Sequence, residues 1–85
     1  MAYNEETLVD LIQVLEDGQI QVREATRVLR DGATIATTYH RYVVDPGIHS
    51  PKDVSDARVA AIAGAIWTDT VVRARRLSME KSVHR

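Results

Sequence analysis

The sequence predicts an α+β fold: a three-stranded antiparallel β-meander followed by two C-terminal helices packed on one sheet face. Asp-Gly occurs twice, at residues 17–18 and 31–32, between runs rich in β-forming residues. Pro-Gly at residues 46–47 ends this pattern, because proline cannot donate to a sheet ladder. The rest of the chain carries apolar residues at helical spacing. We therefore expect one small domain over residues 1–85.

The meander is expected over about residues 7–44. Asp-Gly accepts positive φ at both central turn positions, as a two-residue type I′ hairpin demands. This predicts strands at about Thr7–Glu16, Gln19–Arg30 and Ala33–Val44. The first run could also begin as a short helix, because residues 5–9 are ambiguous at this length.

Two-residue turns also predict the register, and hence which side chains share a face. They place Arg23 opposite His40, and Glu24 opposite both Leu11 and Tyr39. One face then collects Val9, Leu11, Leu15, Ile20, Val22, Val28, Ile35 and Val43. The other face collects Ile12, Val14, Gln21, Arg23, Arg27, His40, Tyr42 and Val44. A bulge at either turn would exchange these faces along a strand.

Two helices are expected after a loop at residues 45–54. Ser55 suits the N-cap of the first, at about residues 55–67, and Thr68 can cap the second, at about 69–80. The first carries one apolar stripe, formed by Val59, Ile62, Ala63, Ile66 and Trp67. Trp67 is interpreted as a core anchor more readily than as a stacking platform.

The composition argues against several classes of function. The chain has no cysteine, and no apolar run of membrane-spanning length, so we expect a protein that is neither exported nor membrane-bound. The net charge of −1 is lower than a dedicated duplex-DNA binder usually shows. His40, His49 and His84 lack metal-site spacing, so neither a metal nor a cofactor is expected. With few candidate nucleophiles and bases, an enzyme is the weakest class.

A ligand site is predicted in the middle of the meander. Arg23, Arg27, His40 and Tyr42 share one face in this register. Guanidinium groups match phosphate oxygens, and tyrosine can stack on a base, so the predicted ligand is anionic. The alternative interpretation is a solvated sheet face. Glu24 and Arg41 would form a structural ion pair on the covered face, unless Arg41 instead lines a cleft and contacts the ligand.

Charge and apolar surface both suggest contacts between copies. Arg73, Arg75 and Arg76 could clamp phosphates of a neighbouring subunit, or could simply form a solvated basic tail. The sheet face away from the helices would expose an apolar set, namely Ile12, Val14, Tyr42 and Val44. Burying that set against a second copy predicts a homo-oligomer.

Three segments carry a resemblance to a known group: "DGQIQVREATRVLRDG", "TYHRYVVDPG" and "VAAIAGAIWTDTVV". Over roughly residues 11–72 the chain resembles short bacteriophage-encoded proteins. Their pattern is a hairpin with Asp-Gly or Asn-Gly turns, a His-Arg pair, a Pro-Gly and a Trp-Thr before the last helix. The chain departs from the group in residues 48–52, which are more basic than its acidic loop, and in its arginine-rich tail.

The resemblance implies a phage protein acting in the host bacterial cytoplasm, with two possible functions. The first is a small homo-oligomeric sponge that evades antiphage defence by sequestering an anionic signal such as a cyclic nucleotide. Arg23, Arg27, His40, Arg41 and Tyr42 would then bind the ligand. The second is a virion structural or accessory protein, a tail or head component acting through protein–protein contacts. The sequence favours the first only slightly.

Overall fold

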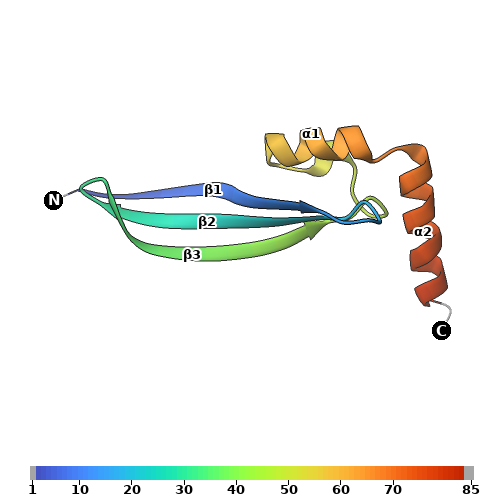
Figure 1. Ribbon diagram of the computed structural model, residues 1–85, viewed down its shortest axis with the longest axis horizontal. Coiled ribbons are helices and arrows are strands. Elements are labelled where there is room, and N and C mark those ends of the chain that lie inside the picture. The colour runs from blue at the N-terminus through green and yellow to red at the C-terminus, as the bar shows by residue number, and fades with distance from the viewer. Residues whose placement is uncertain (1, 84–85) are drawn as a thin grey trace.

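The computed structural model describes residues 2–83 and confirms the α+β class, a three-stranded antiparallel sheet followed by two helices. The strands lie in the order β1-β2-β3, so the chain forms a simple meander (Figure 1). The elements are β1 (Tyr3–Val14), β2 (Ile20–Arg30), β3 (Ala33–Val44), the 3-10 helix η1 (Pro51–Asp53), α1 (Ala57–Ile66) and α2 (Asp69–Val83). β1 is extended from Tyr3 onward, so the alternative of a short initial helix is wrong.

The sheet is much longer than the part that the helices cover. The molecule measures 56 × 28 × 18 Å, and Figure 1 shows the three strands running far beyond α1. We call this free part the arm; it comprises residues 3–8 and 25–40. The remainder, with both helices and the other loops, is the base.

The two Asp-Gly turns differ. At the tip of the arm, Asp31 has φ 52° and Gly32 has φ 86°, which confirms the type I′ turn. At the base only Gly18 is left-handed, with φ 93°, and the amide of Leu15 donates to the carbonyl of Gln19. The expected two-residue turn is wrong here, because the loop is one residue longer. Gly18 lies against α2, where an added Cβ would come 2.6 Å from Val71.

Two bulges change the register further. Asp10 is an extra residue in β1, between Val9 opposite Glu24 and Leu11 opposite Arg23. Ile35 is an extra residue in β3, because Leu29 pairs with Thr34 whereas Val28 pairs with Ala36. Since successive side chains alternate between faces, one extra residue moves all later side chains of that strand to the opposite face.

The predicted faces are wrong in β3 because of the bulge at Ile35, and in the base half of β1 because the base turn is one residue longer. The bulge at Asp10 restores the predicted faces in the rest of β1. Arg41 lies opposite Arg23, and His40 lies opposite Glu24. Cross-strand partners share a face. The helix face, which α1 covers at the base, carries Val9, Ile12, Val14, Ile20, Val22, His40, Tyr42 and Val44. The open face carries Leu8, Leu11, Arg23, Ala25, Arg27, Tyr39, Arg41 and Val43.

The core lies in the base, between the helix face and α1. Ile20, Val59 and Ala63 are fully buried. The predicted stripe of α1 is confirmed, since Ile62, Ile66 and Trp67 pack against the same cluster. Asp56, and not Ser55, is the N-cap: its carboxylate accepts from the amides of the two residues that follow Ala57. The helix thus starts two residues later than expected.

The second helix does not lie on the sheet face as predicted. Figure 1 shows α2 standing across the end of the sheet. Thr68 caps it as expected, because its hydroxyl accepts from the amide of Val71 at 3.3 Å. Trp67 anchors the junction, donating from Nε1 to the carbonyl of Gly18 at 2.6 Å. Among residues 2–83, no helix is both long and apolar enough to cross a membrane.

Candidate functional site

The open face is the candidate functional site, because several large apolar side chains are exposed on it. Leu8, Leu11, Tyr39 and Val43 are between 36% and 58% exposed. Leu8 and Tyr39 both pair with Ala25, which is fully buried between them. No described helix covers this side, so these side chains meet solvent. The expectation of an uncovered apolar face therefore holds, but with different residues: Ile12, Tyr42 and Val44 belong to the core or pack against it.

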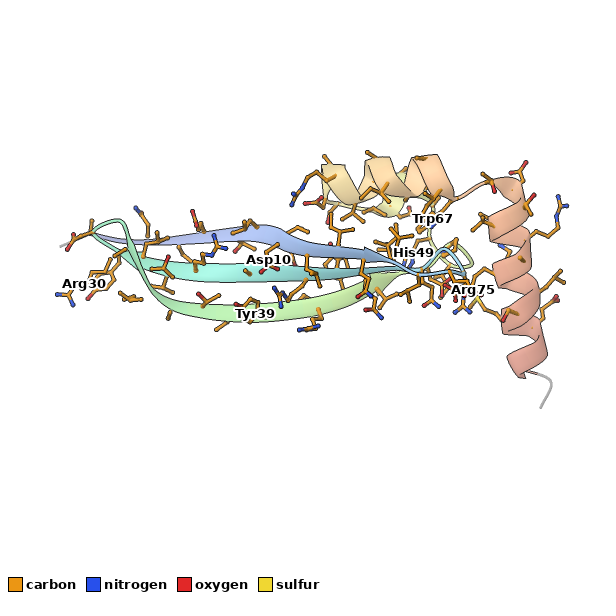
Figure 2. The ribbon with its side chains drawn as sticks, viewed as in Figure 1. Asp10, Arg30, Tyr39, His49, Trp67 and Arg75 are labelled. Carbon is orange, nitrogen blue, oxygen red and sulfur yellow. The ribbon has the colours of Figure 1, made fainter. Side chains whose placement is uncertain are left out.

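A charged cluster sits within this apolar surface. The Arg23 guanidinium donates to both oxygens of Asp10, at 2.9 and 3.0 Å, and lies 4.6 Å from the centre of the Tyr39 ring. Figure 2 shows Asp10 and Tyr39 near the middle of the sheet. The hydrogen bonds from Arg23 lower the pKa of Asp10, and the same contact raises the pKa of Arg23. The bulge turns Asp10 towards Arg23, so it orders this cluster.

A hollow of about 310 Å³ opens beside the cluster. Its lining comes from all three strands: Leu11, Gln21, Val22, Arg23, Arg41, Tyr42 and Val43. Arg41 makes no ion pair or hydrogen bond with any other described residue, whereas Arg27 reaches Glu6 at 3.5 Å. The hollow thus combines apolar walls with one uncompensated cation, and it can receive a carboxylate or a phosphate.

The five predicted ligand-binding residues do not form one site. Arg23, Arg27 and Arg41 lie on the open face, while His40 and Tyr42 lie on the helix face. The His40 and Tyr42 rings are 6.0 Å apart, and burial raises the pKa of the Tyr42 hydroxyl. Grouping His40 and Tyr42 with Arg23 was wrong because the bulge at Ile35 reverses β3.

The predicted structural pair of Glu24 with Arg41 is also wrong. Glu24 lies opposite His40 on the helix face, whereas Arg41 lies opposite Arg23 on the open face. The sheet itself separates the two side chains. Tyr39 and Arg41 are therefore the pair that faces outward from the Tyr-His-Arg-Tyr run.

The predicted basic cluster of α2 is divided as well. Arg75 turns inward and donates to both oxygens of Asp45, with contacts of 2.8 to 3.1 Å, so it is not free to bind another subunit. Arg73 and Arg76 line a separate surface hollow on α2 and remain candidates for an outside contact. The hydrogen bonds from Arg75 lower the pKa of Asp45.

The contacts of Asp45 connect the loop after β3 to α2. Its carboxylate also accepts from the amide of Gly47 at 2.8 Å, and its own amide donates to Nδ1 of His49 at 3.0 Å. Figure 2 shows His49 and Arg75 at this end of the sheet. Sequence reasoning missed this network, because thirty residues separate Asp45 from Arg75. The available signal was an acidic residue directly before Pro-Gly, a position that often caps its own turn.

No group of three or more metal-ligating side chains occurs in the described part of the chain, and His84 lies outside it. No family model, curated protein or solved structure matches the sequence or the fold.

Proposed function

We propose that this protein is a structural assembly protein that acts through protein–protein contacts and self-associates through its open face. One observation carries the proposal: Leu8, Leu11, Tyr39 and Val43 form an exposed apolar surface on the side of the sheet away from α1. A small monomer rarely leaves such a surface in water, and a second copy of the same chain can bury it.

The size of the open face suits an interface. A strand of 12 residues is about 40 Å long, and three strands span roughly 14 Å, so the face presents about 550 Å² before side-chain relief is counted. A typical stable interface takes about 800 Å² from each partner. The open face therefore supplies most of what a self-association surface requires.

The resemblance to short phage-encoded proteins gives this role a setting. An elongated sheet projecting from a small folded base suits a virion structural or accessory protein, a tail or head component made in the host cytoplasm. This is the alternative that the sequence ranked second. The geometry favours it over a sponge, because the bulge at Ile35 disperses the residues expected to bind a nucleotide.

The test compares variants on opposite faces of the sheet. Light scattering after gel filtration should find an oligomer for the wild type at micromolar concentration. Leu11→Ser with Tyr39→Ser should dissociate it, because both side chains belong to the open face. The control, Thr38→Ser with His40→Ser, changes neighbouring residues on the helix face and should leave the oligomer intact. A wild type that stays monomeric at every concentration would overturn the proposal.

A second candidate function is anion binding in the hollow beside Arg41. It is favoured by one observation, the absence of any ion-pair partner for Arg41 within the described residues. Native mass spectrometry with a panel of cyclic nucleotides tests it. Stoichiometric binding that is lost in Arg41→Ala and kept in Arg27→Ala would support a sponge. A protein that binds none of the panel would leave assembly as the function.

A further inference from the structure

The two edge strands of the sheet carry opposite charges. Within the described residues the sheet has three strands, so the outer sides of β1 and β3 pair with no other strand. β1 contains Glu5, Glu6 and Asp10 and no lysine or arginine. β3 contains His40 and Arg41 and no acidic residue. An unpaired strand of 12 residues without proline or lysine, as in β3, is a template for another strand.

The register also sets the two charged positions at the same height along the sheet. Arg41 lies opposite Arg23, and Arg23 lies opposite Leu11, next to the bulged Asp10. β1 and β3 run in the same direction, because each is antiparallel to β2. If a second copy is rotated about an axis parallel to the strands, its β1 comes to lie beside β3 of the first copy. Asp10 of the second copy then lies at the same height along the strands as Arg41 of the first.

Asp10 has the capacity for a second arginine. Each of its oxygens accepts one hydrogen bond from Arg23, and a carboxylate offers about four acceptor positions. Arg41 lies on the open face, as Asp10 does, and has no partner among the described residues. The two side chains are thus complementary in charge, face and height.

We propose that copies of this chain join head to tail, with β3 of one copy paired in parallel to β1 of the next. Asp10 of the next copy then accepts hydrogen bonds from two arginines, namely Arg23 of its own chain and Arg41 of the first copy. This inference rests on the proposed self-association and specifies its geometry.

Repeating such a rotation closes a ring when its angle divides a full turn, and a closed sheet has no edges. The ring turns the open face inward and keeps α1 outside, so one arrangement removes both edges along the arm and covers the apolar surface. Arg58 already donates to the carbonyl of Val9. The new ladder therefore lies on the arm side of that contact, along residues 3–8 of β1 and the level stretch 33–39 of β3.

Disulfide cross-linking tests the strand pairing, because the native chain has no cysteine. Thr7 and Thr38 are exposed, and both pair with Thr26, so they lie at one height on one face. Within one chain they are two strands apart, roughly 10 Å, which is too far for a disulfide. Mixing Thr7→Cys with Thr38→Cys under mild oxidation should give mixed dimers. Neither variant alone should cross-link.

Closing a sheet into a ring also staggers the strands. Ala36→Cys and His40→Cys, two residues to either side of Thr38, are therefore mixed with Thr7→Cys in parallel. The heterologous geometry requires a mixed dimer with at least one of the three β3 variants. Arg41→Gln should weaken association by about tenfold, and Arg27→Gln, which leaves the charged pair unchanged, serves as its control.

The other outcomes are decisive. Faster self-cross-linking of Thr38→Cys than of any mixture would mean that two β3 strands pair across a twofold axis, and it would overturn the head-to-tail geometry. An oligomer that gives no mixed dimer with any of the three would overturn this inference while the proposed open-face association stands. A protein that is monomeric throughout would overturn both.

Discussion

The base and the arm share one continuous sheet but are stabilised in different ways. In the base, Ile20 and Val22 are buried beneath α1, and Arg75 ties α2 to Asp45. In the arm, side chains on both faces are largely exposed, and the strands are held by their ladders and by cross-strand pairs such as Thr7 with Thr26. The comparison teaches that the hydrophobic core belongs to the base alone. The open face, in contrast, continues from the arm into the base, where Leu11, Arg41 and Val43 lie.

The largest expected effect comes from comparing one isoleucine in each region. Ile20→Ala removes a fully buried side chain from the core and should lower the free energy of unfolding by about 3 kcal/mol. Ile35→Ala removes a side chain that is 54% exposed in the arm and should cost well under about 1 kcal/mol. Urea unfolding followed by circular dichroism measures both. Equal losses would contradict the division into base and arm.

The next effect concerns the contact that holds α2. Arg75→Met keeps much of the side-chain length but loses the hydrogen bonds to Asp45, and leaves that carboxylate without its cation. We expect a loss of about 2 kcal/mol, typical of a hydrogen bond to a charged group. Arg76→Met changes an exposed neighbour and should be nearly neutral. The same unfolding measurement compares the two, and a neutral Arg75→Met would contradict the role of this contact.

The pH dependence of stability should arise partly from the base. Because Arg75 lowers the pKa of Asp45 in the folded state, the contribution of this carboxylate is complete above the ordinary aspartate pKa of about 4 and is lost as the pH falls through the lower folded value. Asp45→Asn should be less stable near neutral pH and lose less on acidification. Asp10 and Asp17, whose pKa values are also lowered, keep part of the slope. Urea midpoints from pH 7 down to about pH 2 measure it, and an unchanged acid slope would contradict this assignment.

The smallest effect compares two glycines. Gly32 at the tip of the arm has φ 86°, and nothing surrounds the position of an added Cβ, so Gly32→Ala should cost about 1 kcal/mol through backbone strain alone. Gly64 lies inside α1 with open space beside it, so Gly64→Ala should stabilise the base by up to about 1 kcal/mol. Melting temperatures should move in opposite directions.

The sequence was enough to predict the element order, the strand ends around the tip turn and the apolar stripe of α1. Those features depend on local chemistry: Asp31 and Gly32 favour one turn, and Val59 and Ala63 recur at helical spacing. The site depended instead on two single-residue bulges, at Asp10 and Ile35. Neither residue type has a strong intrinsic preference for a bulge, so local propensity did not reveal either position. The extra residue at Ile35 alone places Arg41 on the open face, where the prediction had placed Tyr42.

The hydrogen bond between Trp67 and Gly18 gives the molecule a built-in optical reporter. Trp67 is the only tryptophan, and its Nε1 lies 2.6 Å from the carbonyl of Gly18, where the start of α2 meets the first hairpin loop. Its fluorescence will therefore shift to longer wavelength when the base opens and water reaches the indole. Tyr3 and Tyr39 lie on the arm, whereas Tyr42 packs against the core of the base. Trp67 emission thus reports on the base alone, and it distinguishes detachment of the helices from a change along the projecting strands without an added dye.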